Sequence, residues 1–282
     1  MITITAHENG KDTVTTHDDN FIPYGFDGGT AYQSQVVLDG PFSYNINGVI
    51  KTGWVLKPKN LEPGKKYPVL YLLHGLGNPA YTEWVGYGNI QQIIGNLMVG
   101  NPKPPVQTIK PMIIVMPDII NSSDEEMGDK LYQFQTFIEF MKPSNGALGI
   151  MDYINRDYPV YTDRSNTSIA GISYGGMIAL YIACVMQDKF YSTGGFSPSG
   201  GLVPNGMLKN SSDFSFGNGK DHFVLIGKGN QDTTVNNDPD SYKNILNKNG
   251  NNNIFCTLPG SHNWTTFKNL LYIYLQYSIF DC

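Results

Sequence analysis

The chain has 282 residues, of which 40% are hydrophobic and 15% are charged, and its formal net charge is −5. This composition excludes disorder for most of the chain and allows one large domain. No cluster of lysines and arginines is dense enough to follow a phosphate backbone, so nucleic acid is not an expected partner. No apolar run reaches the roughly 18 residues needed to cross a bilayer, so no membrane partner is expected.

The N-terminal part differs in character from the rest. Residues 1–30 are polar and glycine-rich without a stable period, and we expect a loosely ordered arm there. Residues 35–57 predict two β-strands. The start of the chain has neither the basic first residues nor the apolar stretch of a signal peptide. A secreted chain that lacks its signal, one module of a longer protein and a cytoplasmic protein are all compatible with this, and secretion is the location we expect.

From residue 68 onward, apolar runs and helical periods alternate. Continuous apolar runs predict buried strands at 68–73, 112–116, 168–170, 223–226 and 254–258. Apolar periodicity predicts helices at 90–97, 177–186, 242–246 and 263–279, and helical material over 134–158 that is broken near 143–146. This order predicts an α/β fold with a mostly parallel central sheet and helices on both faces. We expect residues 1–282 to form a single domain, with strands 35–57 as its β-rich extension and 68–282 as its core.

Three cysteines are too few for a disulfide scaffold, and they lack the spacing of a structural zinc site. Cys184 lies in an apolar helical pattern and is expected to be a buried core residue. Cys256 and Cys282 could pair with each other, but their spacing does not decide it.

The sequence Gly171-Ile172-Ser173-Tyr174-Gly175-Gly176 contains the pattern G-x-S-x-G. It follows a predicted strand and precedes a predicted helix, which is the setting of a nucleophile elbow. In such a turn the serine adopts a strained backbone conformation at the N-terminus of the helix, where negative charge is stabilised. A glycine-rich turn with an N-capping serine is the alternative interpretation.

A serine nucleophile needs a base, and in this fold the base follows the serine and an acid in the chain. His262 lies in a predicted loop between the last strand and the last helix, where the fold supplies its base. His222 directly precedes the strand at 223–226 and is expected to be a strand-edge residue. A surface-loop histidine is the alternative for His262.

The acid is expected on the loop after strand 223–226. Asp232 is the first carboxylate there, and we favour it over Asp238 and Asp240, which begin the next predicted helix and have the position of helix caps. An oxyanion hole needs two backbone donors. We expect them to be the N–H groups of Tyr174 and Leu76, and we expect His74 to brace the Leu76 loop through hydrogen bonds.

Four separated motifs in this order resemble the esterase D-like group, and most closely the feruloyl esterase domains of carbohydrate esterase family 1. They are residues 67–75 (YPVLYLLHG), 161–164 (YTDR), 171–176 (GISYGG) and 260–264 (GSHNW), and the resemblance covers about residues 45–280. It implies an α/β-hydrolase fold, a catalytic triad of Ser173, Asp232 and His262, an oxyanion hole at Leu76 and Tyr174, and no metal or organic cofactor. The implied substrate is feruloylated arabinoxylan or a related hydroxycinnamoyl ester of the plant cell wall.

Two positions depart from the family pattern. Tyr174 replaces the frequent methionine after the nucleophile, and Ser261 replaces a glycine before the histidine. Tyr81, Trp84 and Trp264, with Tyr87 nearby, lie close to the motifs and are candidates to stack on a phenolic or sugar ring. Acetylxylan esterases and S-formylglutathione hydrolases share the triad, so both remain alternatives, and a non-catalytic carbohydrate-binding protein on this scaffold is a more distant one.

Overall fold

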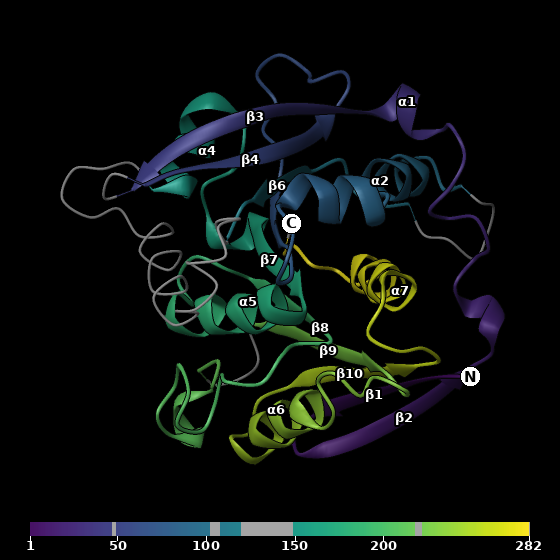
Figure 1. The fold of residues 1–282 in the computed structure, drawn as a ribbon, viewed down its shortest axis with the longest axis vertical. Coiled ribbons are helices and arrows are strands. Elements are labelled where there is room, and N and C mark those ends of the chain that lie inside the picture. The colour runs from purple at the N-terminus through teal and green to yellow at the C-terminus, as the bar shows by residue number, and fades with distance from the viewer. Residues whose placement is uncertain (47–48, 102–107, 120–148, 218–221, 282) are drawn as a thin grey trace.

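A computed structural model describes residues 1–46, 49–101, 108–119, 149–217 and 222–281 of the chain. Within these residues, ten strands form one sheet in the order β2-β1-β10-β9-β8-β7-β5-β6-β4-β3 (Figure 1). The strands are β1 (Ile2–Glu8), β2 (Lys11–His17), β3 (Val36–Ile46), β4 (Val49–Pro58), β5 (Val69–Leu73), β6 (Ile113–Pro117), β7 (Thr167–Ile172), β8 (Ser192–Phe196), β9 (Phe223–Gly229) and β10 (Asn253–Leu258). Strands β5 to β10 run parallel to one another, and antiparallel pairs close both edges of the sheet.

Helices cover both faces of this sheet. They are α1 (Tyr32–Gln35), η2 (Tyr81–Tyr87), α2 (Ile90–Met98), α4 (Ile150–Asp157), α5 (Ser173–Val185), α6 (Asp238–Lys248) and α7 (Trp264–Leu275), with short 3₁₀ turns η1 (Asp19–Phe21), η4 (Arg164–Asn166) and η5 (Ser211–Asp213). Helices α4, α5 and α6 pack into one apolar cluster, whereas α2 and α7 pack into the other (Figure 1). The sheet separates the two clusters.

The central strands are apolar on successive residues because both of their faces are buried. In β5, Val69, Tyr71 and Leu73 belong to the cluster under α5, and Leu70 and Leu72 belong to the cluster under α7. All five residues are at most 1% exposed. The predicted strand and helix alternation is therefore the observed architecture, and the predicted strands at 35–57 correspond to β3 and β4.

The expectation of a loosely ordered arm for residues 1–30 is wrong. Strands β1 and β2 form a hairpin, and β1 extends the sheet by pairing antiparallel with β10. The turn is Asn9-Gly10, with φ values of 51° and 77°. Asn-Gly is a strong hairpin signal because both residues tolerate positive φ. Ile2 and Ile4 on the inner face of β1 are buried, and this burial holds the hairpin on the sheet.

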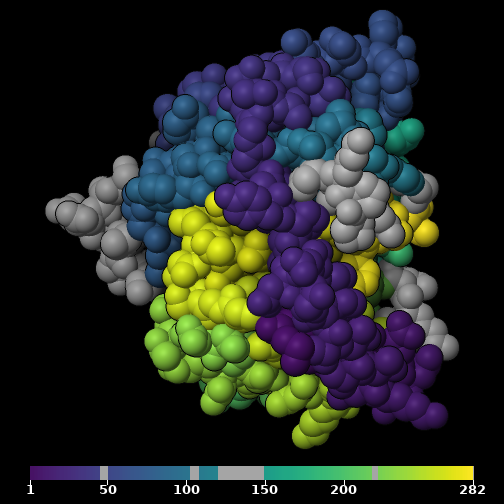
Figure 2. Space-filling view, turned by 90° about the vertical axis from the view of Figure 1, so that its right-hand side faces the viewer, coloured from purple at the N-terminus to yellow at the C-terminus, as the bar shows by residue number. Residues whose placement is uncertain are grey.

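The segment between the hairpin and β3 joins opposite edges of the sheet by crossing the face that carries α7 and α2 (Figure 2). The Asn96 side chain donates hydrogen bonds to the carbonyls of Phe26 and Gly28, at 2.9 and 2.7 Å. Asp27 forms an ion pair with Lys268 of α7. Residues 26–28 of this segment are thus attached to α2 and α7.

Smaller differences concern single elements. Strand β8 has the sequence Ser-Thr-Gly-Gly-Phe and lacks the apolar run that predicts a strand, although it is buried throughout. Of the helical material predicted over 134–158, residues 150–157 form α4, and residues 134–148 lie outside the described ones. None of the helices within the described residues has the length and apolar character that a bilayer crossing requires.

Cys184 is buried in α5, as predicted, and burial raises the pKa of its thiol. Cys256 is fully buried in β10, and burial raises its pKa to about 12. Cys282, its suggested partner, lies outside the described residues.

Candidate active site

Ser173 lies at the junction of β7 and α5, at the carboxyl edge of the parallel strands. Its φ is +49°, a left-handed conformation that is uncommon for a residue with a side chain. Small neighbours allow the turn, because a Cβ on Gly171 would come within 2.5 Å of the Gly175 carbonyl and a Cβ on Gly175 within 2.2 Å of the His74 carbonyl oxygen. This strained, close-packed turn is the geometry of a nucleophile elbow.

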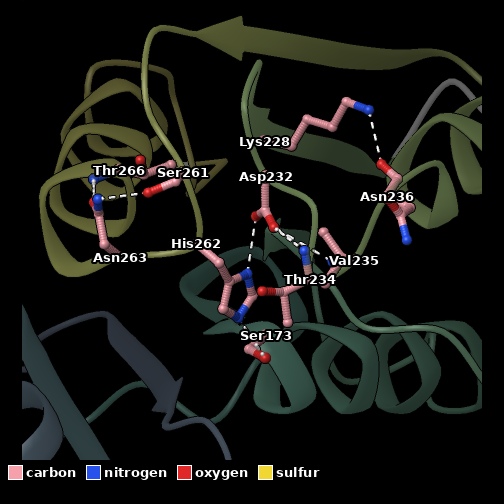
Figure 3. Close-up of polar contacts among 10 residues, drawn as sticks. All are labelled: Ser173, Lys228, Asp232, Thr234, Val235, Asn236, Ser261, His262, Asn263 and Thr266. Atoms are coloured by element: carbon pink, nitrogen blue, oxygen red, sulfur yellow. Dashed lines mark hydrogen bonds and ion pairs between the residues drawn. The ribbon is translucent and has the colours of Figure 1, made fainter.

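Three side chains from different loops form one hydrogen-bonded series (Figure 3). His262 Nε2 lies 3.0 Å from Ser173 Oγ, and His262 Nδ1 lies 2.8 Å from Asp232 Oδ2. The other oxygen of Asp232 accepts the backbone N–H groups of Thr234 and Val235, at 3.1 and 3.3 Å. The carboxylate is therefore held in one orientation toward the imidazole, and the imidazole toward the hydroxyl.

The loops that carry Asp232 and His262 are tied to each other. Backbone N–H groups of Asn230 and Gln231 donate to the carbonyls of Leu258 and Gly260, both at 2.8 Å. Gly229 allows this approach, since a Cβ there would lie 2.3 Å from the Gly260 carbonyl oxygen. The positions of the carboxylate and the imidazole are thus set by the pairing of β9 with β10, which brings the two loops together.

The rival residues lie elsewhere. Asp238 begins α6 and its carboxylate lies against Gly200, and Asp240 pairs with Lys228. His222 is buried at the start of β9 and stacks on Phe216, with ring centroids 4.3 Å apart. Burial lowers the pKa of His222 to about 3, which keeps its ring neutral.

The loop that follows β5 lies beside the serine. A Cβ on Gly75 would be 3.6 Å from Ser173 Cβ. His74 is fully buried, and its Nε2 accepts the N–H of Ile119 at 2.9 Å, so its Nδ1 carries the proton that is donated to the Gly75 carbonyl at 2.7 Å. Burial lowers the pKa of His74 to about 4, which favours this neutral form. His74 thus braces the loop through hydrogen bonds.

A second attachment holds the far end of this loop, and the sequence did not point to it. Asp118, at the end of β6, accepts the N–H of Ala80 at 2.6 Å and also bonds the hydroxyl of Thr52. Both ends of the segment 74–80 are therefore fixed to the neighbouring residues 118 and 119. Asp118 follows the apolar run of β6 directly, and a carboxylate at the end of a buried strand is the signal that could have marked it.

The aromatic candidates have different environments. Trp84 is completely buried and its indole meets that of Trp264 edge-on, at 5.3 Å between centroids, so it is a packing residue and we do not retain it as a substrate contact. Tyr81 is 46% exposed and Trp264 is half-buried. The Tyr174 side chain is buried in the cluster under α5, and burial raises the pKa of its phenol.

Comparison with known proteins identifies the class. The Esterase family model matches residues 43–275, so the chain belongs to this esterase family. It is a carboxylic ester hydrolase with the α/β-hydrolase fold, as the sequence motifs predicted.

Several solved structures of esterases are similar to this chain over most of its length. A carbohydrate esterase family 1 ferulic acid esterase from the anaerobic fungus Anaeromyces mucronatus has 25% identity and a TM-score of 0.76, over 90% of this chain and 94% of its own. The feruloyl esterase module of Clostridium thermocellum, solved with sinapinate, has 19% identity and a TM-score of 0.68, over 92% of each chain. S-formylglutathione hydrolase from Staphylococcus aureus has 18% identity and a TM-score of 0.64, over 87% of this chain and 97% of its own.

Proposed function

We propose that Ser173, His262 and Asp232 are the catalytic triad of a serine esterase that releases hydroxycinnamic acids from plant cell-wall polysaccharide. The observation that carries the triad is the continuous hydrogen-bonded series from Asp232 through His262 to Ser173. Each residue then has one role: Ser173 is the nucleophile, His262 is the general base and acid, and Asp232 maintains the tautomer and orientation of His262.

The reaction has two steps. His262 Nε2 takes the proton of Ser173 Oγ, which attacks the ester carbonyl carbon, and the alcohol leaves with that proton, so an acyl-enzyme forms. Water then gives a proton to His262 and attacks the acyl-enzyme. The acid departs and Ser173 recovers its proton.

We assign the stabilisation of the oxyanion in each tetrahedral intermediate to hydrogen bonds from the N–H groups of Tyr174 and Leu76. Because Gly75 directs its carbonyl toward His74, and because the N–H of a trans peptide points opposite to its C=O, the Leu76 N–H points away from His74. Gly75 lies close to Ser173, and this supports a direction of the Leu76 N–H toward the nucleophile. The N-terminus of α5 adds a favourable dipole at the same place.

Two observations support a hydroxycinnamoyl acyl group. Family 1 feruloyl esterases are among the similar structures, one of them at 25% identity over most of the chain. An exposed aromatic side chain, Tyr81, lies on the helix that follows the oxyanion loop. The resemblance to S-formylglutathione hydrolase supports a small-acyl thioesterase as the second candidate. We also propose an extracellular location, because an enzyme can reach an insoluble cell-wall polysaccharide only outside the cell.

The test is a comparison of acyl groups on one leaving alcohol, with methyl ferulate and methyl acetate as substrates. Burying a phenyl-sized group contributes about 2 kcal/mol, or roughly thirtyfold in kcat/KM if the contact is made in the transition state. We expect at least about a tenfold preference for the ferulate. Equal or faster acetate turnover would contradict the feruloyl specificity and leave the esterase assignment intact, whereas rapid S-formylglutathione turnover would favour the second candidate.

A further inference from the structure

Each end of the helix η2 carries an exposed tyrosine, Tyr81 at the first residue and Tyr87 at the last. Tyr81 is 46% exposed and its ring lies 4.7 Å from that of Trp54, on β4. Tyr87 is 52% exposed and its ring lies 6.2 Å from that of Trp264, the first residue of α7. Strand β4 lies beyond β5 and β6 from the nucleophile strand, whereas α7 continues from the loop of His262, so the two tyrosines lean toward opposite sides of the site.

A series of packed rings connects Tyr87 with His262. The imidazole meets Phe267 edge-on at 4.9 Å, and Phe267 meets Trp264 edge-on at 5.7 Å. The buried Trp84 supports Trp264 from another direction, and Gly88 lets the chain approach closely, since a Cβ there would lie 2.9 Å from Trp264 Cζ3. The indole under Tyr87 is therefore fixed by packing.

The chemistry assigns different parts of an ester to the two sides. In the proposed reaction the carbonyl oxygen lies toward residues 74–77, and the alcohol oxygen receives its proton from His262 Nε2. The alcohol portion of the ester therefore extends on the His262 side of the serine. Tyr87 is an exposed aromatic ring that packs on Trp264 at that side. An exposed ring on a rigid support can pack against the apolar face of a sugar.

We propose that Tyr87, supported by Trp264, forms a subsite for a sugar residue in the alcohol portion of the ester. The ligand class is a neutral oligosaccharide, recognised by packing of its C–H face on the phenol ring. This inference rests on the proposed function, because the direction of the alcohol follows from the roles given to Ser173 and His262.

The first experiment compares two esters of one acid: methyl ferulate, and ferulate carried by the arabinose of a xylo-oligosaccharide. The measured quantity is the ratio of kcat/KM for the sugar ester to that for the methyl ester. Tyr87→Ala should lower this ratio about fivefold, the order expected for the loss of one exposed apolar contact. Tyr87→Phe should keep the ratio of the parent because it keeps the ring.

Tyr81→Ala is the matched control, since Tyr81 has similar exposure on the same helix and also leans on a tryptophan. Any effect of this variant should fall on both esters alike and leave the ratio as in the parent. A ratio that Tyr87→Ala does not lower, or that Tyr81→Ala lowers equally, would overturn the subsite. So would a parent enzyme that shows no preference for the sugar ester.

A second experiment measures the subsite without turnover. Electrophoresis in a gel that contains soluble arabinoxylan should retard the parent and Tyr87→Phe, and should retard Tyr87→Ala less. Equal mobility of Tyr87→Ala and the parent, relative to a gel without polysaccharide, would contradict the proposal. A parent that fails to hydrolyse methyl ferulate would contradict the acyl specificity instead, and the gel result would still decide the sugar subsite.

Discussion

His262 Nδ1 lies 2.8 Å from an oxygen of Asp232, whose side chain has no exposed surface. A buried carboxylate loses the solvation of water, and here two backbone N–H groups and the imidazole replace it. The oxygen of Asp232 that faces Nδ1 can thus hold the Nδ1–H tautomer of His262. In this tautomer Nε2 carries no proton and can accept the proton of Ser173.

The exchange Asp232→Asn should keep the shape of this site and remove its charge. The amide can present its NH₂ group to Nδ1 and favour the wrong tautomer, so we expect kcat to fall by about 10⁴. Asp238→Asn and Asp240→Asn are matched controls on α6 and should each cost less than about tenfold. If Asp238→Asn lowered kcat more than Asp232→Asn, the assignment of the acid would be wrong.

Replacement of Ser173 by alanine should abolish ester hydrolysis, because it removes the nucleophile. Circular dichroism and the free energy of unfolding should show an intact fold, since the positive φ is retained and one hydroxyl is lost. A fluorophosphonate should label the parent at Ser173 and leave Ser173→Ala unlabelled. Esterase activity of the variant within tenfold of the parent would contradict the assignment of Ser173 as the nucleophile.

The glycines of the elbow predict a contrast in stability. Gly175→Ala places a methyl group 2.2 Å from the His74 carbonyl oxygen, and the backbone must move to relieve the clash. We expect the free energy of unfolding to fall by about 2 kcal/mol, measured by urea denaturation. Gly75→Ala is the control: its methyl group meets Ser173 Cβ at 3.6 Å, an ordinary contact, and should change stability by less than about 1 kcal/mol. Equal stability of the two variants would contradict the close packing of the turn.

The two buried neutral histidines predict a loss of stability in mild acid. Burial lowers the pKa of His74 to about 4 and that of His222 to about 3, below the value of about 6.5 in an unfolded chain. Between pH 6.5 and these values the unfolded chain binds protons that the folded chain does not, so the free energy of unfolding falls as the pH falls. Each unit of pKa difference corresponds to about 1.4 kcal/mol.

His222→Phe tests this effect at a position away from the serine. The phenyl ring can keep the stack on Phe216 and cannot titrate. The free energy of unfolding, measured from pH 7 to pH 4, should therefore fall less steeply in the variant than in the parent. Identical slopes would show that His222 does not contribute to acid sensitivity.

The sequence by itself predicted most of the alternating strands and helices after residue 68, the tight turn at Ser173 and the loop of His262. These features are local: a strand buried on both faces must be apolar on successive residues, and a tight turn must carry glycines. The hairpin of residues 2–17 was also available locally, in the alternation of Ile2 and Ile4 and in the turn Asn9-Gly10. The polarity of β2, which is exposed at the sheet edge, concealed it.

Other features depend on contacts between distant segments, and only the tertiary structure decided them. Asp232, Asp238 and Asp240 have the same chemistry, but the pairing of β9 with β10 brings Asp232 alone of these three to His262. Strand β8 contains glycines because its own Phe196 and Leu180 of α5 leave little room: Cβ atoms on Gly194 and Gly195 would meet these side chains at 2.9 Å. Trp84 and Tyr87 lie three residues apart on one short helix, yet one is in the core and the other in solvent. Which ring is available to a substrate follows from how η2 packs on α7, and that packing joins residues about 180 positions apart in the chain.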